Sequence, residues 1–146
     1  MTITKEVTNR IEDVINQRLK AYTSSQPDIR SDLEGYLGEG NVNFIYPLNL
    51  FEFEDPIKHF YVFHKGFISE VTYNLEIIEI VTRPFEVELI KYSPPSEQQE
   101  TECAMLYIKI DENYSLNFNS LADSHDYVRE SFKKMIHEIY TYSLTS

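Results

Sequence analysis

The sequence contains one cysteine, no tryptophan and no long hydrophobic run, and these absences exclude whole classes of protein. Because Cys103 is the only cysteine, an intramolecular disulfide is impossible, which excludes the disulfide-rich secreted scaffolds. No apolar run approaches the ~20 residues that a membrane-spanning helix needs. The first residues show neither the basic start nor the apolar block of a signal peptide. We therefore expect a cytoplasmic protein, the alternative being a protein exported without a cleaved signal.

Basic residues are also scarce. The chain has 13 Lys and Arg against 24 Asp and Glu, a formal net charge of −11 at pH 7. Residues 28–112 hold 17 of the acidic and 6 of the basic residues, so this middle segment carries the whole net charge. A field of one sign attracts basic partners and repels nucleic acid and anionic membranes. We expect a basic protein partner, no direct nucleic-acid binding and no membrane binding.

The residues that are present suffice for a hydrophobic core. Hydrophobic residues make up 42% of the 146 positions, and 11 Tyr and 9 Phe are among them. Disordered acidic chains lack such residues, because they cannot bury enough apolar surface to fold. The length is that of one domain, so we expect a single domain over residues 1–146.

Both ends of the chain have helical periodicity. Hydrophobic residues recur at helical spacing over residues 3–22, with Thr2 as the expected N-cap. A second stripe predicts a helix over residues 121–142. Ser120 is its expected N-cap, and Asp123 would lie in the first turn, where the helix dipole favours an anion.

Between these helices the hydrophobic pattern alternates, which predicts strands. Short connections favour antiparallel neighbours, and Lys65-Gly66 is a two-residue hairpin signal. The order predicts an α+β fold: an antiparallel sheet of five to seven strands flanked by long N- and C-terminal helices, with one sheet face open. A short helix is expected over residues 29–37, and strands over residues 42–46, 59–64, 67–73, 75–82, 85–90, 103–110 and 114–118.

No short motif has the geometry of a catalytic or metal site. Ser124-His125-Asp126 has the composition of a hydrolase triad, but adjacent helical residues point in different directions. His59 and His64 would lie on opposite faces of one strand, so they cannot bind one metal together. We therefore predict no catalytic residue, no metal ligand and no cofactor.

Two further features favour packing or linker roles. Cys103 lies among apolar and acidic neighbours and lacks the base or positive surroundings that activate a thiol. The glycines of residues 35–40 have the reverse of the dinucleotide-loop spacing and precede a strand. We interpret this segment as a linker.

Glutamates interleaved with hydrophobic residues are the best candidates for a binding surface. Glu76, Glu79, Glu86 and Glu88 alternate with Ile, Val and Leu, and Tyr92 follows them. Because Glu is rarely buried, these side chains should lie on the open face of the sheet. Tyrosine is enriched at interfaces. We predict that these five residues bind a partner, the alternative being that glutamates only keep an exposed sheet soluble.

Three classes of function follow. The first is a stoichiometric inhibitor that docks a basic surface, such as that of a nuclease or a nucleic-acid-binding enzyme. In composition the chain resembles toxin-immunity proteins and phage-type inhibitors of defence nucleases, although no motif carries the resemblance. The second is a small acidic secretion-type or client chaperone acting as a homodimer, because the helix–sheet–helix order is similar in outline. The third is a small enzyme or ligand-binding fold, for which the sequence indicates no particular residues.

Overall fold

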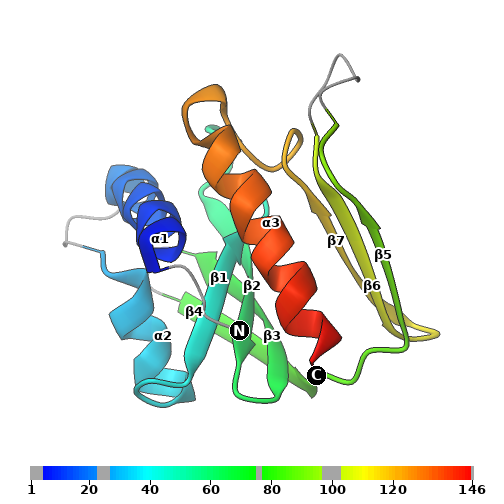
Figure 1. Cartoon of the computed structure of the whole chain (residues 1–146). Helices are drawn as coiled ribbons and strands as arrows, with labels where there is room; N and C mark the ends of the chain where they lie inside the picture. The colour runs from blue at the N-terminus through cyan, green and yellow to red at the C-terminus, as the bar shows by residue number, and fades with distance from the viewer. Residues whose placement is uncertain (1–4, 23–26, 75–76, 97–102, 146) are drawn as a thin grey trace.

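The computed structural model describes residues 5–22, 27–74, 77–96 and 103–145 (Figure 1). Its helices are α1 (Lys5–Leu19), α2 (Ile29–Leu37) and α3 (Arg129–Leu144), with short 3-10 helices η1 (Lys20–Tyr22) and η2 (Asp126–Val128). The strands are β1 (Val42–Pro47), β2 (Ile57–His64), β3 (Phe67–Asn74), β4 (Ile77–Pro84), β5 (Leu89–Ser93), β6 (Met105–Asp111) and β7 (Tyr114–Asn119).

All strand pairs are antiparallel, and they form two sheets. Sheet A has the order β1-β2-β3-β4, and sheet B has the order β5-β6-β7. The predicted α+β fold, with five to seven antiparallel strands between terminal helices, is confirmed, and the strands number seven; they form two sheets instead of the one sheet expected. The predicted strand over residues 85–90 is wrong in its first half. The chain leaves sheet A after Pro84, and β5 begins only at Leu89.

The elements form layers around sheet A (Figure 1). Helix α2 lies against one face of sheet A, while α3 and sheet B lie against the other. Helix α1 packs along the β1 edge, where it contacts α2 and α3. The expectation of one open sheet face is therefore wrong for the central strands. Splitting the strands into two sheets allows sheet B to bury hydrophobic surface against sheet A, which a single sheet cannot do.

Aromatic rings hold the two sheets and α3 together. The ring centroid of Phe118 on β7 lies 4.9 Å from that of Tyr46, 5.3 Å from Tyr61 and 6.1 Å from Phe63. The ring of Phe132 on α3 packs 5.5 Å from Tyr46. All five side chains are buried. Without tryptophan, Phe and Tyr supply the large side chains of the core.

The C-terminal helix begins later than predicted. Ser120 and Asp123 do not cap α3, which begins at Arg129 after η2. Instead the hydroxyl of Ser120 accepts a hydrogen bond from the backbone N–H of Ala104 at 2.8 Å. The carboxylate of Asp123 accepts from the Tyr46 hydroxyl at 2.6 Å and from the Asn119 N–H at 2.9 Å. Both side chains thus satisfy polar groups on or beside β1, β6 and β7, which would lack these partners if Ser120 and Asp123 capped a helix instead.

The other local predictions have mixed outcomes. The helix expected over residues 29–37 is confirmed as α2. Lys65 and Gly66 form the turn between β2 and β3, and Gly66 has a φ of 84°, a conformation that favours glycine. The N-terminal helix ends at Leu19 and continues as η1. Thr2, its expected cap, lies outside the described residues. Among the described residues, no helix has the length and hydrophobicity needed to cross a membrane.

Candidate functional site

The five residues predicted to bind a partner do not share one sheet face. Glu79 lies on β4 of sheet A and Tyr92 lies within β5 of sheet B. Glu86 and Glu88 lie in the connection between the two sheets, so the predicted Glu86–Glu88 strand face does not form. Glu76 lies outside the described residues. The binding role of these residues stays a prediction, but it no longer rests on a common strand surface.

Some basic side chains of the acidic middle segment bind oxygen atoms of the same chain. Lys58 is fully buried, and its Nζ donates to the carbonyl oxygens of Asn49 and Glu52 at 3.2 Å and 2.8 Å. Lys109 Nζ lies 3.2 Å from a carboxylate oxygen of Glu112 and 3.8 Å from one of Glu88. These cations neutralise nearby oxygens, and most other carboxylates of the segment remain as surface charge.

Five carboxylates line a groove of about 810 Å³ between α1 and α2, here called the α1–α2 groove, and three of them belong to the acidic middle segment. Helix α1 contributes one polar face, because positions 9, 12, 13 and 16 follow helical spacing. Helix α2 and its flanking loops form the other side. The charged residues of the groove are Glu12, Asp13, Asp28, Glu34, Glu39 and Arg30.

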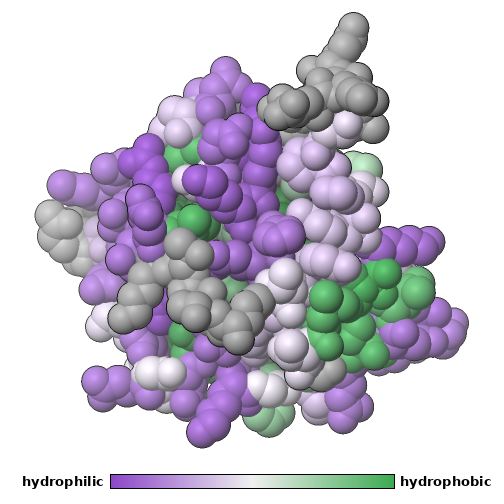
Figure 2. All heavy atoms as spheres, viewed as in Figure 1, coloured by the Kyte–Doolittle hydropathy of each residue, from purple (hydrophilic) through white to green (hydrophobic). Residues whose placement is uncertain are grey.

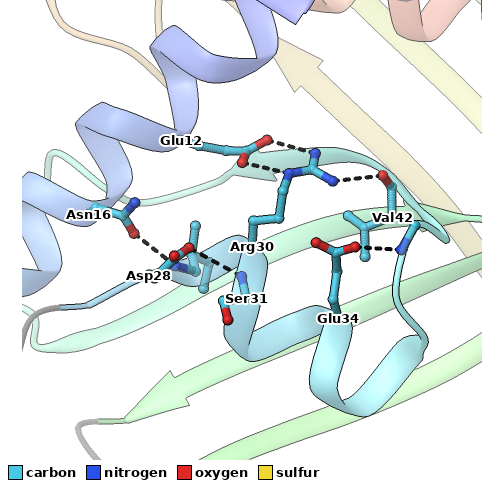
Figure 3. A network of polar contacts seen from close by, with 9 residues as sticks. Glu12, Asn16, Asp28, Arg30, Ser31, Glu34 and Val42 are labelled. Atoms are coloured by element: carbon cyan, nitrogen blue, oxygen red, sulfur yellow. Dashed lines mark hydrogen bonds and ion pairs between the residues drawn. The ribbon is translucent and has the colours of Figure 1, made fainter.

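Arg30, the single cation of the α1–α2 groove, is bound by Glu12 (Figure 3). Its Nε and Nη2 donate to the two carboxylate oxygens of Glu12 at 2.7 Å and 2.8 Å, a bidentate pair. Its Nη1 donates to the carbonyl oxygen of Val42 on β1 at 2.9 Å. The hydrogen bond to buried Glu12 raises the pKa of Arg30 above its ordinary value. Arg30 therefore neutralises Glu12 and ties α1, α2 and β1 together.

The other carboxylates are held by the backbone or left exposed. Asp28 caps α2 by accepting from the Ser31 N–H at 3.2 Å, and Glu34 accepts from the Gly40 N–H (Figure 3). Backbone N–H groups orient a carboxylate without cancelling its charge. Asp13 and Glu39 are exposed and make no ion pair within the described part of the chain. The groove thus has a preorganised negative charge.

Arg30→Ala should destabilise the protein by about 2 kcal/mol, because Glu12 would be buried without its charged partner. This loss of stability is smaller than for a fully buried ion pair, because the Arg30 side chain is 30% exposed. Arg30→Lys should cost less, since lysine keeps the charge but cannot form the bidentate pair. Urea unfolding at neutral pH measures both losses of stability. Each follows from the shift of the unfolding midpoint, provided that the m-value does not change. A midpoint equal to that of wild type for Arg30→Ala would contradict the structural role of this pair.

Tyr92 lies in a second groove, of about 840 Å³, between the start of α1, α3 and the end of β5. Its ring stacks on Tyr140 of α3 with 4.4 Å between centroids, and its hydroxyl lies 3.2 Å from Nδ1 of His137. Burial raises the pKa of Tyr92. Tyr92 thus packs on α3 instead of joining Glu86 and Glu88. The charges of this groove are mixed: Glu6, Glu130 and Glu138 face Arg10, Lys133 and Lys134.

The residues considered for catalysis or metal binding lie apart from one another. His59 and His64 lie on opposite faces of β2, as expected; His59 faces Thr72 and His64 faces Ser69. The thiol of Cys103, which precedes β6, donates to Oδ1 of Asn119 at 3.1 Å. In the described ranges, no group of three or more His, Cys, Asp or Glu could hold a metal ion.

Comparison of this chain with protein families, with curated proteins and with solved structures finds no match. A proposal for function therefore rests on the surface of the molecule. Figure 2 shows hydrophilic residues over α1 and α2, and a hydrophobic area beside sheet B. The exposed hydrophobic side chains of β5 and of the C-terminal end of α3 include Leu89 and Leu144.

Proposed function

We propose that this chain is an acidic stoichiometric binding protein that docks a basic protein surface through the α1–α2 groove. One observation carries the proposal: the groove has five carboxylates and one guanidinium, and Glu12 already binds that guanidinium. A partner's Lys and Arg side chains would meet Asp13, Asp28 and Glu39. Charge complementarity of this kind accelerates association and is weakened by salt.

An exposed aromatic side chain of α2, outside the lining of the groove, offers a further contact surface. Tyr36 of α2 is 66% exposed, and the preceding Gly35 lines the groove. Tyrosine is enriched among the residues that dominate interface energies, because it offers a large contact area at a small entropic cost. We assign Tyr36 as a contact beside the groove and the carboxylates of the groove as the source of fast, oriented encounter.

The partner class follows from the charge. Nucleases, nucleic-acid-binding enzymes and toxins that bind phosphate have basic surfaces, and an acidic protein that covers such a surface prevents nucleic acid from reaching it. We place this chain with stoichiometric inhibitors of the immunity-protein or phage anti-defence type, acting in the cytoplasm.

The test is a pair of double substitutions with equal charge changes. Asp13→Lys with Glu39→Lys reverses two exposed carboxylates of the α1–α2 groove, and Glu86→Lys with Glu88→Lys does the same between the sheets. A protein captured from the native host by the wild-type chain serves as the partner. We expect the groove variant to slow association at least about tenfold and to flatten its salt dependence, with little change for the other variant.

The opposite pattern would relocate the binding surface to the connection between the sheets. Equal, small effects of both variants would contradict docking through charge altogether. Circular dichroism should show that both variants keep the fold, because the substituted side chains are exposed.

A further inference from the structure

Strand β4 is an outer edge of sheet A, and no strand in the described ranges pairs with that edge. The opposite edge, β1, is covered by α1, and Arg30 binds the carbonyl oxygen of Val42 there. Strand β4 runs over eight residues, and an exposed edge of this length has a row of unpaired backbone N–H and C=O groups. Such an edge is a template for another strand.

The hydrogen-bond pattern shows which backbone groups of β4 do not bond to β3. The N–H of Phe85 donates to the carbonyl oxygen of Gly66 at 3.0 Å, in register with the β3–β4 ladder. Bonded and non-bonded positions alternate along an antiparallel pair, so the odd-numbered residues of β4 bond to β3. The N–H and C=O groups of Ile78, Ile80 and Thr82 therefore point away from the sheet, and Pro84 adds a carbonyl only.

The side chains of this edge have a distinct charge pattern. Glu79, Val81 and Arg83 alternate and so share one face of β4. Val81 is 45% exposed, and exposed Glu79 makes no ion pair within the described part of the chain. The guanidinium of Arg83 lies 3.9 Å over the ring of Tyr114, and its buried Nε has no hydrogen-bond partner among the described residues.

We propose that two copies of this chain pair antiparallel through β4, with a twofold axis at Val81. In this register Ile80 and Thr82 of opposite copies form hydrogen-bonded pairs, which uses the free backbone groups. Val81 faces Val81 of the second copy. Glu79 of each copy lies directly opposite Arg83 of the other, so the interface has two symmetric ion pairs. Sheet A then continues across the axis as one sheet.

The charge pattern selects this register and a second copy as the occupant. With the axis at Ile80, Glu79 would face Val81; with the axis at Thr82, Glu79 would face Phe85. Both shifts leave the charges unpaired. Within one chain, Glu79 and Arg83 are about 13 Å apart along the strand, too far to pair with each other. Their complementarity therefore exists only between two copies.

Sedimentation over a range of protein concentrations, at about 0.15 M salt to screen the net charge, tests the pairing. Glu79→Arg places two arginines opposite each other, and Arg83→Glu places two glutamates opposite each other. We expect each substitution to raise the dimer dissociation constant at least about tenfold, since two pairs change from attraction to repulsion. An equimolar mixture of the two variants should restore association, because every charge then meets its opposite across the axis.

Three results would overturn the proposal: a wild-type chain that stays monomeric at millimolar concentration, a dimer that Glu79→Arg leaves unchanged, or a mixture no more associated than its components. Arg83→Glu also removes the contact with Tyr114, so its fold is checked by circular dichroism. If Arg83→Glu does not fold, Glu79→Arg alone tests the pairing, because Glu79 is exposed and its replacement should leave the fold intact. The inference is independent of the α1–α2 groove, and Asp13→Lys with Glu39→Lys should leave the dimer intact.

Discussion

Phe118→Ala should lower the free energy of unfolding by about 3–5 kcal/mol, the cost of removing a buried phenylalanine ring. Phe118 is 2% exposed, and its ring joins β7 of sheet B to Tyr46, Tyr61 and Phe63 of sheet A. Since a domain of this kind has a total stability of about 5–15 kcal/mol, this one change removes a large part of it. Urea unfolding, followed by circular dichroism, measures the loss.

Phe67→Ala is the matched control for this prediction. Phe67 begins β3 beside the hairpin turn, and its side chain is 44% exposed. Within the described part of the chain, its ring stacks only on His64, with 5.8 Å between centroids. We expect a loss below about 1 kcal/mol, because a side chain near the surface leaves no cavity when it is removed. Equal losses for the two variants would show that sheet B does not depend on Phe118 for its position.

Above about pH 10 the stability of the protein should fall steeply, by up to about 4 kcal/mol per pH unit. Burial raises the pKa of Tyr46, Tyr61 and Tyr114, and all three side chains are under 9% exposed. Above the ordinary tyrosine pKa, the unfolded chain releases these protons while the folded chain retains them. The unfolded state then binds fewer protons, so the stability falls as pH rises, by about 1.4 kcal/mol per tyrosine and pH unit.

Lys58 has the opposite effect on the change of stability with pH, because burial lowers its pKa. The unfolded chain then holds the lysine proton up to a higher pH than the folded chain, which adds stability as pH rises toward the ordinary lysine pKa. One such group cannot offset three tyrosines. The net result remains a loss of stability in the alkaline range.

Urea unfolding at several pH values, together with the ultraviolet absorbance of tyrosinate, tests the alkaline prediction. Tyr46→Phe should reduce the slope of stability against pH by about one proton, while it also removes the hydrogen bond to Asp123. Tyr127→Phe is the control, because the Tyr127 side chain is 54% exposed. A stability that stays constant between pH 9 and 11, or ionisation of Tyr46 before unfolding, seen as a loss of tyrosinate absorbance in folded Tyr46→Phe, would contradict the prediction.

The local elements could be predicted because neighbouring residues decide them. Asp28 caps α2 through its own backbone neighbours, and Gly66 accepts the positive φ that the β2–β3 turn requires. The start of α3 was predicted wrongly because Ser120 and Asp123 look like capping residues. In the structure they accept hydrogen bonds from Ala104, Tyr46 and Asn119 instead of from a helix end. Capping and packing compete for the same side chains, and distant contacts decide between them.

The candidate site was predictable only in part. The polar face of α1 is visible in the spacing of Glu12, Asp13 and Asn16, but nothing local shows that α2 lies opposite it. Glu86 and Glu88 alternate as strand residues do, yet the chain passes between two sheets at that point. Among the predicted residues that the structure describes, Glu79 lies on its expected strand and is exposed. Alternation indicates which side chains share a face, not whether the backbone is paired.

By itself the sequence determined the acidic charge, the helical ends and the alternating strands, because composition and periodicity act over a few residues. The division into two sheets, the groove between α1 and α2, and the free edge of β4 were decided by tertiary structure alone. These features depend on which hydrophobic faces bury each other most completely, and that choice joins residues far apart in the chain.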